Sequence, residues 1–118
     1  MADAFDKWRE FHKTMPLQNM GRTWVEIDSA ALIANVSVAR NAATQAAIMA
    51  VVKADAYGHG IKEVTSQLNR HVEAFGVATL TEALTVRQAV GKKQMIMILG
   101  ALLPEEHEAA LLSGLHVT

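Results

Sequence analysis

Residues 47–60 read AIMAVVKADAYGHG and combine an apolar segment with a polar turn. The continuous apolar run over 47–52 is typical of a strand in a parallel sheet that is covered on both faces. Lys53 follows this run directly, and a charged side chain is costly to hide beside a buried strand. The carboxyl ends of parallel strands form the usual ligand-binding edge of α/β folds. These residues therefore predict a parallel α/β fold with a candidate functional lysine.

The alternation of strands and helices continues on both sides of this stretch. Apolar runs predict further strands, and apolar residues three or four positions apart predict helices between them. The expected strands cover residues 24–28, 74–79, 95–99 and 115–118, and the expected helices cover 29–39, 61–69 and 82–89, with a last one opened by Pro104. Asp28 or Ser29 is placed to cap the first helix. Strands that alternate with helices are joined by right-handed crossovers, so the sheet should be parallel.

The regular spacing of the strands suits either a (β/α)8 barrel or a doubly wound sheet. A complete barrel needs eight units and usually about 200 residues or more, whereas this sequence has 118. A doubly wound sheet is disfavoured because no helix follows the last strand. We therefore predict an α/β fold, a partial parallel (β/α)8 TIM-type barrel comprising about its first half. The barrel portion should cover residues 22–118, after a short helical N-terminal extension and linker over 1–21.

Composition and charge exclude several classes of protein. A content of 51% hydrophobic and 19% charged residues, with a formal net charge of -1, is incompatible with intrinsic disorder. Eleven Lys and Arg are balanced by 12 Asp and Glu, which argues against nucleic-acid binding by bulk charge. The lack of cysteine excludes a disulfide scaffold and a cysteine nucleophile. No apolar run approaches the roughly 18 residues of a membrane span, and charges throughout the first 22 residues disfavour a secretory signal, so a cytoplasmic protein is expected.

Lys53 and Tyr57 are the residues with the clearest chemical potential. An amine held away from water favours its neutral form, which condenses with an aldehyde to give a Schiff base. The hydroxyl of Tyr57 can donate to an anion such as a phosphate, and Gly58 and Gly60 can adopt positive φ. Taken singly, each residue has a simpler explanation, because a strand-end lysine is usually solvated and a tyrosine usually packs. His59 has no second histidine at metal-ligand spacing, so no metal site is predicted.

Taken together, these residues resemble a known family. The segment VVKADAYGHG at 51–60 is similar to the pyridoxal-phosphate attachment segment of the alanine racemases. The resemblance extends to RTWVEID at 22–28, to FGVA at 75–78 with the following Glu82-Ala83-Leu84, and to IMILG at 96–100. It covers about residues 22–118. Related pyridoxal-phosphate barrels are expected to share the lysine without the Tyr-Gly-His-Gly run.

The resemblance implies a homodimeric, two-domain enzyme that interconverts L- and D-alanine and supplies D-alanine for peptidoglycan. Lys53 matches the lysine that holds pyridoxal 5'-phosphate as a Schiff base and serves as one of two acid/base groups. Tyr57 matches a tyrosine that contacts the cofactor phosphate. A tyrosine from the partner subunit's C-terminal domain is the second acid/base group of the family. The substrate is then a small amino acid, and no nucleic acid or membrane is involved.

Three interpretations remain open, because most other family site residues are expected beyond Thr118. The chain is the N-terminal portion of an alanine racemase, a catalytically inactive truncated product, or a complete small α/β module that binds pyridoxal phosphate or another ligand without catalysis. Half a parallel barrel leaves strand edges unpaired. We therefore expect the free chain to aggregate or to depend on a partner half.

Overall fold

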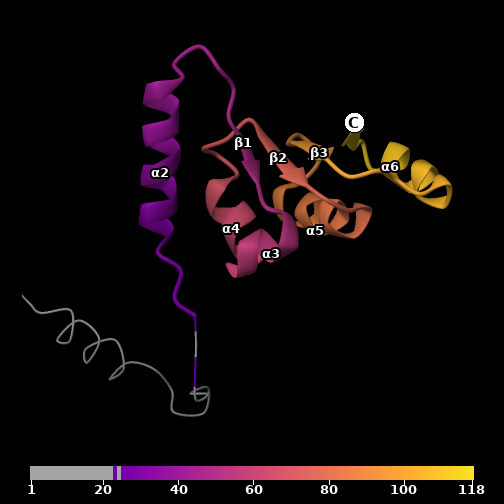
Figure 1. Ribbon diagram of the computed structural model, residues 1–118, viewed down its shortest axis with the longest axis horizontal. Coiled ribbons are helices and arrows are strands. Elements are labelled where there is room, and N and C mark those ends of the chain that lie inside the picture. The colour runs from indigo at the N-terminus through magenta and orange to yellow at the C-terminus, as the bar shows by residue number, and fades with distance from the viewer. Residues whose placement is uncertain (1–22, 24) are drawn as a thin grey trace, which may run out of the picture.

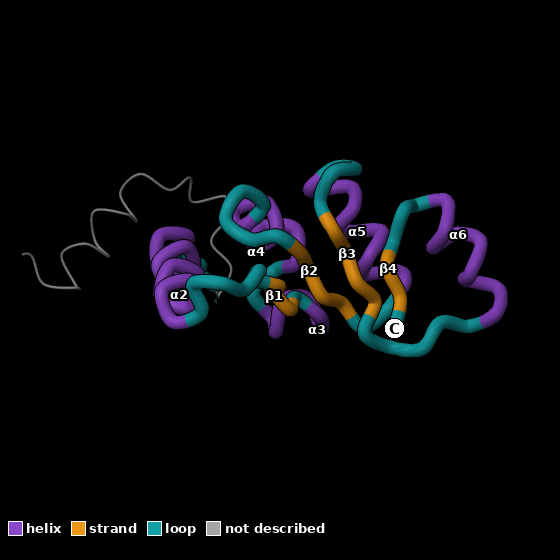
Figure 2. Tube along the Cα trace, turned by 90° about the horizontal axis from the view of Figure 1, so that it is seen from above, coloured by secondary structure: helices purple, strands orange, loops and turns teal. Residues whose placement is uncertain are grey.

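The computed structural model describes residue 23 and residues 25–118. Its sheet has four parallel strands in the order β1-β2-β3-β4, and Figure 2 shows them following one another in chain order. The strands are β1 (Met49–Val51), β2 (Ala74–Val77), β3 (Met95–Ile98) and β4 (His116–Val117). A doubly wound sheet reverses its strand order at a switch point, and a barrel does not. The predicted α/β fold, a partial TIM-type barrel, is confirmed.

Helices separate the strands and pack mainly on one face of the sheet (Figure 1). They are α2 (Ser29–Ala42), α3 (Lys53–Gly58), α4 (Ile61–Leu68), α5 (Leu80–Val90), the 3-10 turn η2 (Pro104–Glu106) and α6 (His107–Leu112). Asp28 caps α2, since its Oδ1 accepts the Ala31 amide at 3.0 Å. Pro104 opens η2 as expected. No helix in the described part of the chain is long and apolar enough to cross a membrane.

The core lies between the sheet and the helices α4 and α5. Four side chains of β2 and β3 have no exposed surface: Phe75, Val77, Ile96 and Ile98. Register pairs Phe75 with Ile96 and Val77 with Ile98, so these residues share one face of the sheet. Full burial of each of these side chains stabilises the folded state by about 1.5–3 kcal/mol. This face therefore contributes most to stability.

The opposite face of the sheet is open, which corrects the expectation that the apolar run over 47–52 is covered on both sides. Val51 is 39% exposed and Leu99 is 41% exposed. An apolar run predicts that a strand is buried. It does not show whether the described residues themselves supply the atoms that cover the strand. This open side corresponds to the interior of a barrel.

The predicted strand over 24–28 is wrong where the structure tests it. Residues 25–28 form no strand, and Val25 is 74% exposed. Alternating apolar residues favour a strand only where a neighbouring strand supplies hydrogen bonds. Here the segment leads into α2, which packs against α4 and stands beside the sheet in Figure 1. Trp24 and the predicted helical extension over 1–21 lie outside the described residues.

An ion pair connects α2 to the edge of the sheet. The Arg40 Nη2 donates to the Glu73 Oε1 at 2.9 Å and to the His71 carbonyl oxygen at 2.9 Å. Glu73 Oε2 also accepts the Ile48 amide at 2.7 Å. That backbone hydrogen bond, followed by the bond and charge of Arg40, lowers the pKa of Glu73 below its ordinary value of 4.5 despite some desolvation.

The ion pair predicts that the free energy of unfolding decreases at acidic pH. Because the folded pKa of Glu73 is depressed, its contribution is complete above pH 4.5 and is lost as the pH falls through the folded pKa. Glu73→Gln should therefore be less stable than the unaltered chain at pH 7, with the gap closing toward pH 3. Urea unfolding between these pH values measures it, with exposed Glu105→Gln as the control. A gap independent of pH would contradict the assignment.

Candidate functional site

Lys53 follows the carboxyl end of β1 and begins α3. Its side chain is exposed, and its Nζ makes no hydrogen bond or ion pair with another residue of the described part. The expectation of a lysine desolvated beside a buried strand is therefore not met in this chain. Lys53 lies just beyond the last residue of β1, at the start of α3, where its side chain remains exposed. The amine is accessible at the carboxyl end of β1.

The backbone after Lys53 forms a left-handed turn. Residues 54–57 have φ values of 53°, 55°, 54° and 55°, and their ψ values lie between 36° and 52°. Left-handed backbone disfavours L-residues by about 1–2 kcal/mol each. Four such residues in succession require surrounding contacts that hold them in place. The turn is therefore a strained element directly beside the candidate lysine.

The end of the turn passes into α4 through glycines and a side-chain cap. Gly58 and Gly60 have φ values of 83° and 88°, which confirms the positive φ that glycine permits. Asp55 Oδ1 accepts the Ile61 amide at 2.8 Å, at the start of α4. His59 Nδ1 lies 2.9 Å from the Ala56 carbonyl oxygen, so it is held locally within the loop. These bonds fix the far end of the turn.

Tyr57 is the last residue of the left-handed turn that follows Lys53. Its side chain is 60% exposed, so it is not a core residue. It borders a hollow of about 360 Å³ between β1, α2 and α4, which Lys53 does not line. The structure thus brings the two predicted residues into one turn and shows no direct bond between them. An exposed phenol at this place can donate a hydrogen bond to an anionic ligand.

Glu82 is the site residue that sequence reasoning missed. Its Oε1 accepts the Ala54 amide at 2.7 Å, and its Oε2 accepts the Ala78 amide at 2.8 Å. Thr79 Oγ1 accepts the Glu82 amide at 3.3 Å, and the Thr79 amide donates back to Oε2 at 3.3 Å, which completes a capping box. The spacing Thr-x-x-Glu signals such a box. It does not reveal the bond to Ala54.

An apolar floor lies beside the Lys53 edge on the open face. Val51 and Gly76 are register partners, as are Gly76 and Met97. Gly76 allows close packing, since a Cβ at this position would lie 3.1 Å from the Met49 Sδ and 3.2 Å from the Leu99 Cδ1. An amine at the edge of an apolar surface is a suitable place for a carbonyl-bearing ring. The Lys53 amine and this apolar surface therefore permit covalent binding of such a ring.

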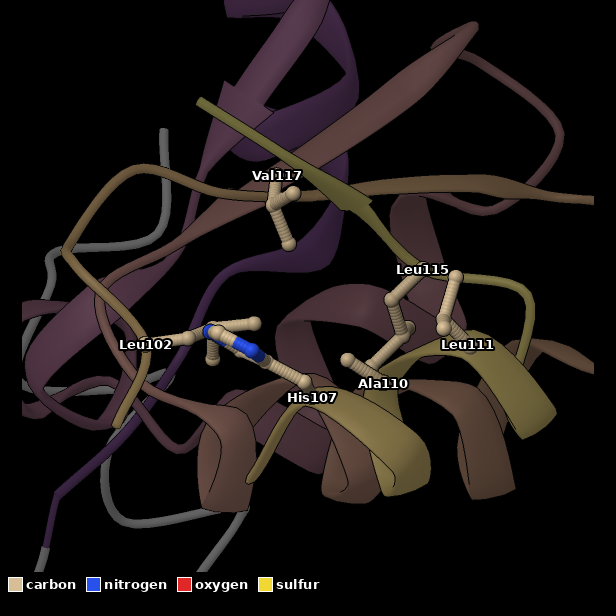
Figure 3. Close-up of a pocket in the computed structure, with 6 residues that line it drawn as sticks. All are labelled: Leu102, His107, Ala110, Leu111, Leu115 and Val117. Carbon is tan, nitrogen blue, oxygen red and sulfur yellow. The ribbon is translucent and has the colours of Figure 1, made fainter. Parts of the chain in front are cut away.

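A separate apolar hollow lies at the other end of the sheet, between α6 and β4. It has a volume of about 270 Å³, and Figure 3 shows its side chains, Leu102, His107, Ala110, Leu111, Leu115 and Val117. None of these residues belongs to β1, β2 or α3. Val117 pairs in register with the buried Ile98, so the hollow is on the helix-bearing side. It is therefore an opening in the helix layer and is distinct from the Lys53 site.

Potential metal ligands do not cluster around Lys53. The described residues contain no group of three or more His, Cys, Asp or Glu side chains that could hold a metal ion. The polar groups of the site are an amine, a phenol and a carboxylate engaged by backbone amides. Such a set suits covalent binding of a carbonyl compound with an anionic substituent.

The chain is similar to known proteins over most of its length. Residues 27–118 match the family described as "Alanine racemase, N-terminal domain". The alanine racemase of Fusobacterium nucleatum is 43% identical over 97 residues, which are 81% of this chain and 27% of that protein. This chain thus spans about a quarter of the length of that relative.

Two solved structures share the fold. The Bacillus anthracis alanine racemase with bound L-Ala-P has a TM-score of 0.75 and 33% identity, over 81% of this chain and 25% of that one. The Bartonella henselae alanine racemase with covalently bound pyridoxal phosphate has a TM-score of 0.73 and 29% identity, over 77% of this chain and 26% of that one. With the match over residues 27–118, the strand order and the Lys53 turn, this chain belongs to the alanine racemase family.

Proposed function

We propose that this chain supplies the lysine side of a pyridoxal-phosphate-dependent site that interconverts L- and D-alanine. The observation that carries the proposal is the exposed amine of Lys53 at the carboxyl end of β1, followed by a fixed turn that ends in Tyr57. The covalently bound pyridoxal phosphate of the Bartonella henselae relative supports the choice of cofactor. Residues 22–118 are proposed to be the N-terminal portion of the cofactor-binding barrel.

The residues present fit pyridoxal 5'-phosphate. Lys53 offers a primary amine without a competing partner among the described residues. Tyr57 offers a hydroxyl donor at the end of the same turn. The floor around Gly76 is apolar and lies on the open face of the sheet. An aldehyde-bearing aromatic ring with a phosphate requires these three kinds of contact.

Each residue has a defined chemical role in this proposal. The Lys53 amine would hold the cofactor covalently through its aldehyde group, with water as the leaving group. Bound pyridoxal phosphate supplies an electron sink for the charge that develops at the substrate α-carbon. The Lys53 Nζ would take or return the α-proton of the substrate on one face. The Tyr57 hydroxyl donates a hydrogen bond to the phosphate and so orients the ring.

The remaining chemistry is assigned to the whole protein. Racemisation needs an acid/base group on the opposite face, and Tyr57 is the single tyrosine of this sequence. We propose that the opposite-face tyrosine comes from the C-terminal domain of a partner subunit in a homodimer. We propose that the whole enzyme acts in the cytoplasm and supplies D-alanine for peptidoglycan. This chain alone is proposed to be inactive as a racemase.

The proposal predicts selective labelling of Lys53. The purified chain is mixed with pyridoxal phosphate and reduced with borohydride, and the modified peptide is identified by mass. Label should be concentrated on the peptide that contains Lys53, because among the lysines that the structure describes only Lys53 follows the carboxyl end of a strand. Lys53→Arg keeps the positive charge but cannot form a Schiff base, so the label should be lost.

Lys62→Arg is the matched control, since Lys62 is an exposed residue of α4, and this variant should keep the label. Label spread evenly over the lysines would contradict the proposal and favour a module that does not use Lys53. Label on Lys53 in a chain without racemase activity is the expected result, and it separates cofactor binding from catalysis.

A further inference from the structure

We propose that Glu82 is a positioning residue for Lys53, acting through the backbone of the turn. Its carboxylate joins the carboxyl ends of two neighbouring strands. One oxygen accepts the amide of Ala54, the residue directly after Lys53, at 2.7 Å. The other oxygen accepts the amide of Ala78, directly after β2, at 2.8 Å. The part of the proposal that concerns cofactor capture rests on the proposed function of Lys53.

Helix capping explains only part of this arrangement. In a capping box the Glu side chain bonds to the backbone of the N-cap residue, here Thr79. The Glu82 Oε2 meets that requirement at 3.3 Å. The bond from Oε1 reaches back 28 residues in sequence, to a different βα unit. It contributes nothing to the cap of α5, so its structural effect falls on the Lys53 turn.

The three backbone donors match the two oxygens of a carboxylate. A carboxylate only accepts hydrogen bonds, and its two oxygens can serve the amides of Ala54, Ala78 and Thr79 together. A glutamine side chain has a similar shape, but its amide nitrogen would face a backbone N–H. One of the two strand ends would then lose its acceptor. Glutamate is therefore the side chain that suits this place.

The bond to Ala54 acts at the first residue of the left-handed turn. Ala54 has φ 53° and ψ 52°, and the orientation of its amide depends on that backbone conformation. Asp55, the second residue of the turn, accepts the Ile61 amide and so connects the turn to the start of α4 at its far end. Because L-residues disfavour this conformation, the contacts at both ends select it. Glu82 therefore fixes the direction in which Lys53 leaves the strand, and it does so without touching the reacting amine.

The test compares Glu82→Gln with Thr79→Ala. Thr79→Ala removes the hydroxyl that caps α5 and leaves the carboxylate of Glu82 on Ala54. Amide hydrogen exchange of the purified chain reports backbone order directly, without cofactor. We expect exchange over residues 53–58 to rise about tenfold in Glu82→Gln, the effect of losing one charge-assisted hydrogen bond, and to stay unchanged in Thr79→Ala. The rate of borohydride-trapped labelling of Lys53 should fall in Glu82→Gln alone.

Exchange over α4 shows whether each variant is folded. If Glu82→Gln unfolds the chain, Glu82→Asp replaces it, because a carboxylate one methylene shorter keeps the charge at α5 but cannot span to Ala54. It should loosen residues 53–58 in the same way. Equal effects of the Glu82 and Thr79 variants on residues 53–58, or none, would overturn the proposal and leave Glu82 as a helix cap. Failure to label Lys53 in the unaltered chain would instead overturn the proposed function, while the exchange comparison still tests Glu82.

Discussion

Replacing Gly100 with alanine is expected to destabilise the chain by about 2–3 kcal/mol, the upper part of the usual cost of overpacking. Gly100 follows β3, where the chain passes the end of β2. A Cβ at this position would overlap the carbonyl oxygen of Ala78 and lie 3.5 Å from its carbonyl carbon. Both are backbone atoms, and the amide of the same residue is held by Glu82. The two strand ends would have to separate.

Urea unfolding of the purified chain measures the effect of Gly100→Ala. Gly76→Ala is the matched control, because its new methyl would meet the Met49 Sδ at 3.1 Å and the Leu99 Cδ1 at 3.2 Å. These are the ends of flexible side chains on the open face, so they can move aside. The loss of stability should be clearly smaller at position 76. Equal unfolding midpoints for the two variants would refute the assignment of the clash to backbone.

Arg87→Met is expected to destabilise the chain by about 2–4 kcal/mol, because several charge-assisted hydrogen bonds are lost at once. The guanidinium of this α5 residue connects two loops. It donates to the carbonyl oxygens of Gly91 and Gln94, both at 2.7 Å, Ser113 at 3.1 Å and Gly114 at 2.9 Å. Burial lowers the pKa of Arg87 from its ordinary value, but guanidinium stays charged at any physiological pH.

Arg87→Lys tests whether the planar guanidinium group, with its several N–H donors, matters in addition to its charge. A lysine ammonium is a compact point donor that cannot reach four carbonyl groups in fixed directions. It should recover only part of the stability lost in Arg87→Met, as measured by thermal unfolding of the three proteins. Full recovery by lysine would show that charge alone holds the loops. No loss in either variant would show that water replaces the guanidinium at these carbonyl groups.

The order of elements could be predicted from sequence because each strand and helix has a local signal. Apolar runs gave β1 to β4 within a few residues, and Asp28 and Pro104 gave helix starts. The strand predicted over 24–28 failed because strand formation depends on a partner that the local pattern does not contain. The exposure of Lys53 could not be predicted for a related reason, since burial depends on which elements cover the sheet.

The sequence predicts which residues form the candidate site, but it does not predict the conformation of their backbone. Lys53 and Tyr57 are set apart by their place after a strand and by the neighbouring glycines. The left-handed turn has no such signal, because alanine and tyrosine strongly favour right-handed or extended backbone. It exists through a contact with Glu82, 28 residues away in sequence. Sequence spacing shows a capping box at Thr79 and Glu82, but not its second partner.

The left-handed turn after Lys53 also restricts which substitutions the chain tolerates. At residues 54–57 the cost of a side chain depends on how much it crowds the left-handed backbone. Valine, isoleucine and threonine crowd this backbone most, and glycine crowds it least. Glycine would relieve the crowding but would give the unfolded chain more freedom to lose on folding. Alanine, with the smallest side chain that still restrains the unfolded backbone, is a compromise at positions 54 and 56. Sequence drift in this segment is thus limited by backbone chirality, even where a side chain contacts no ligand.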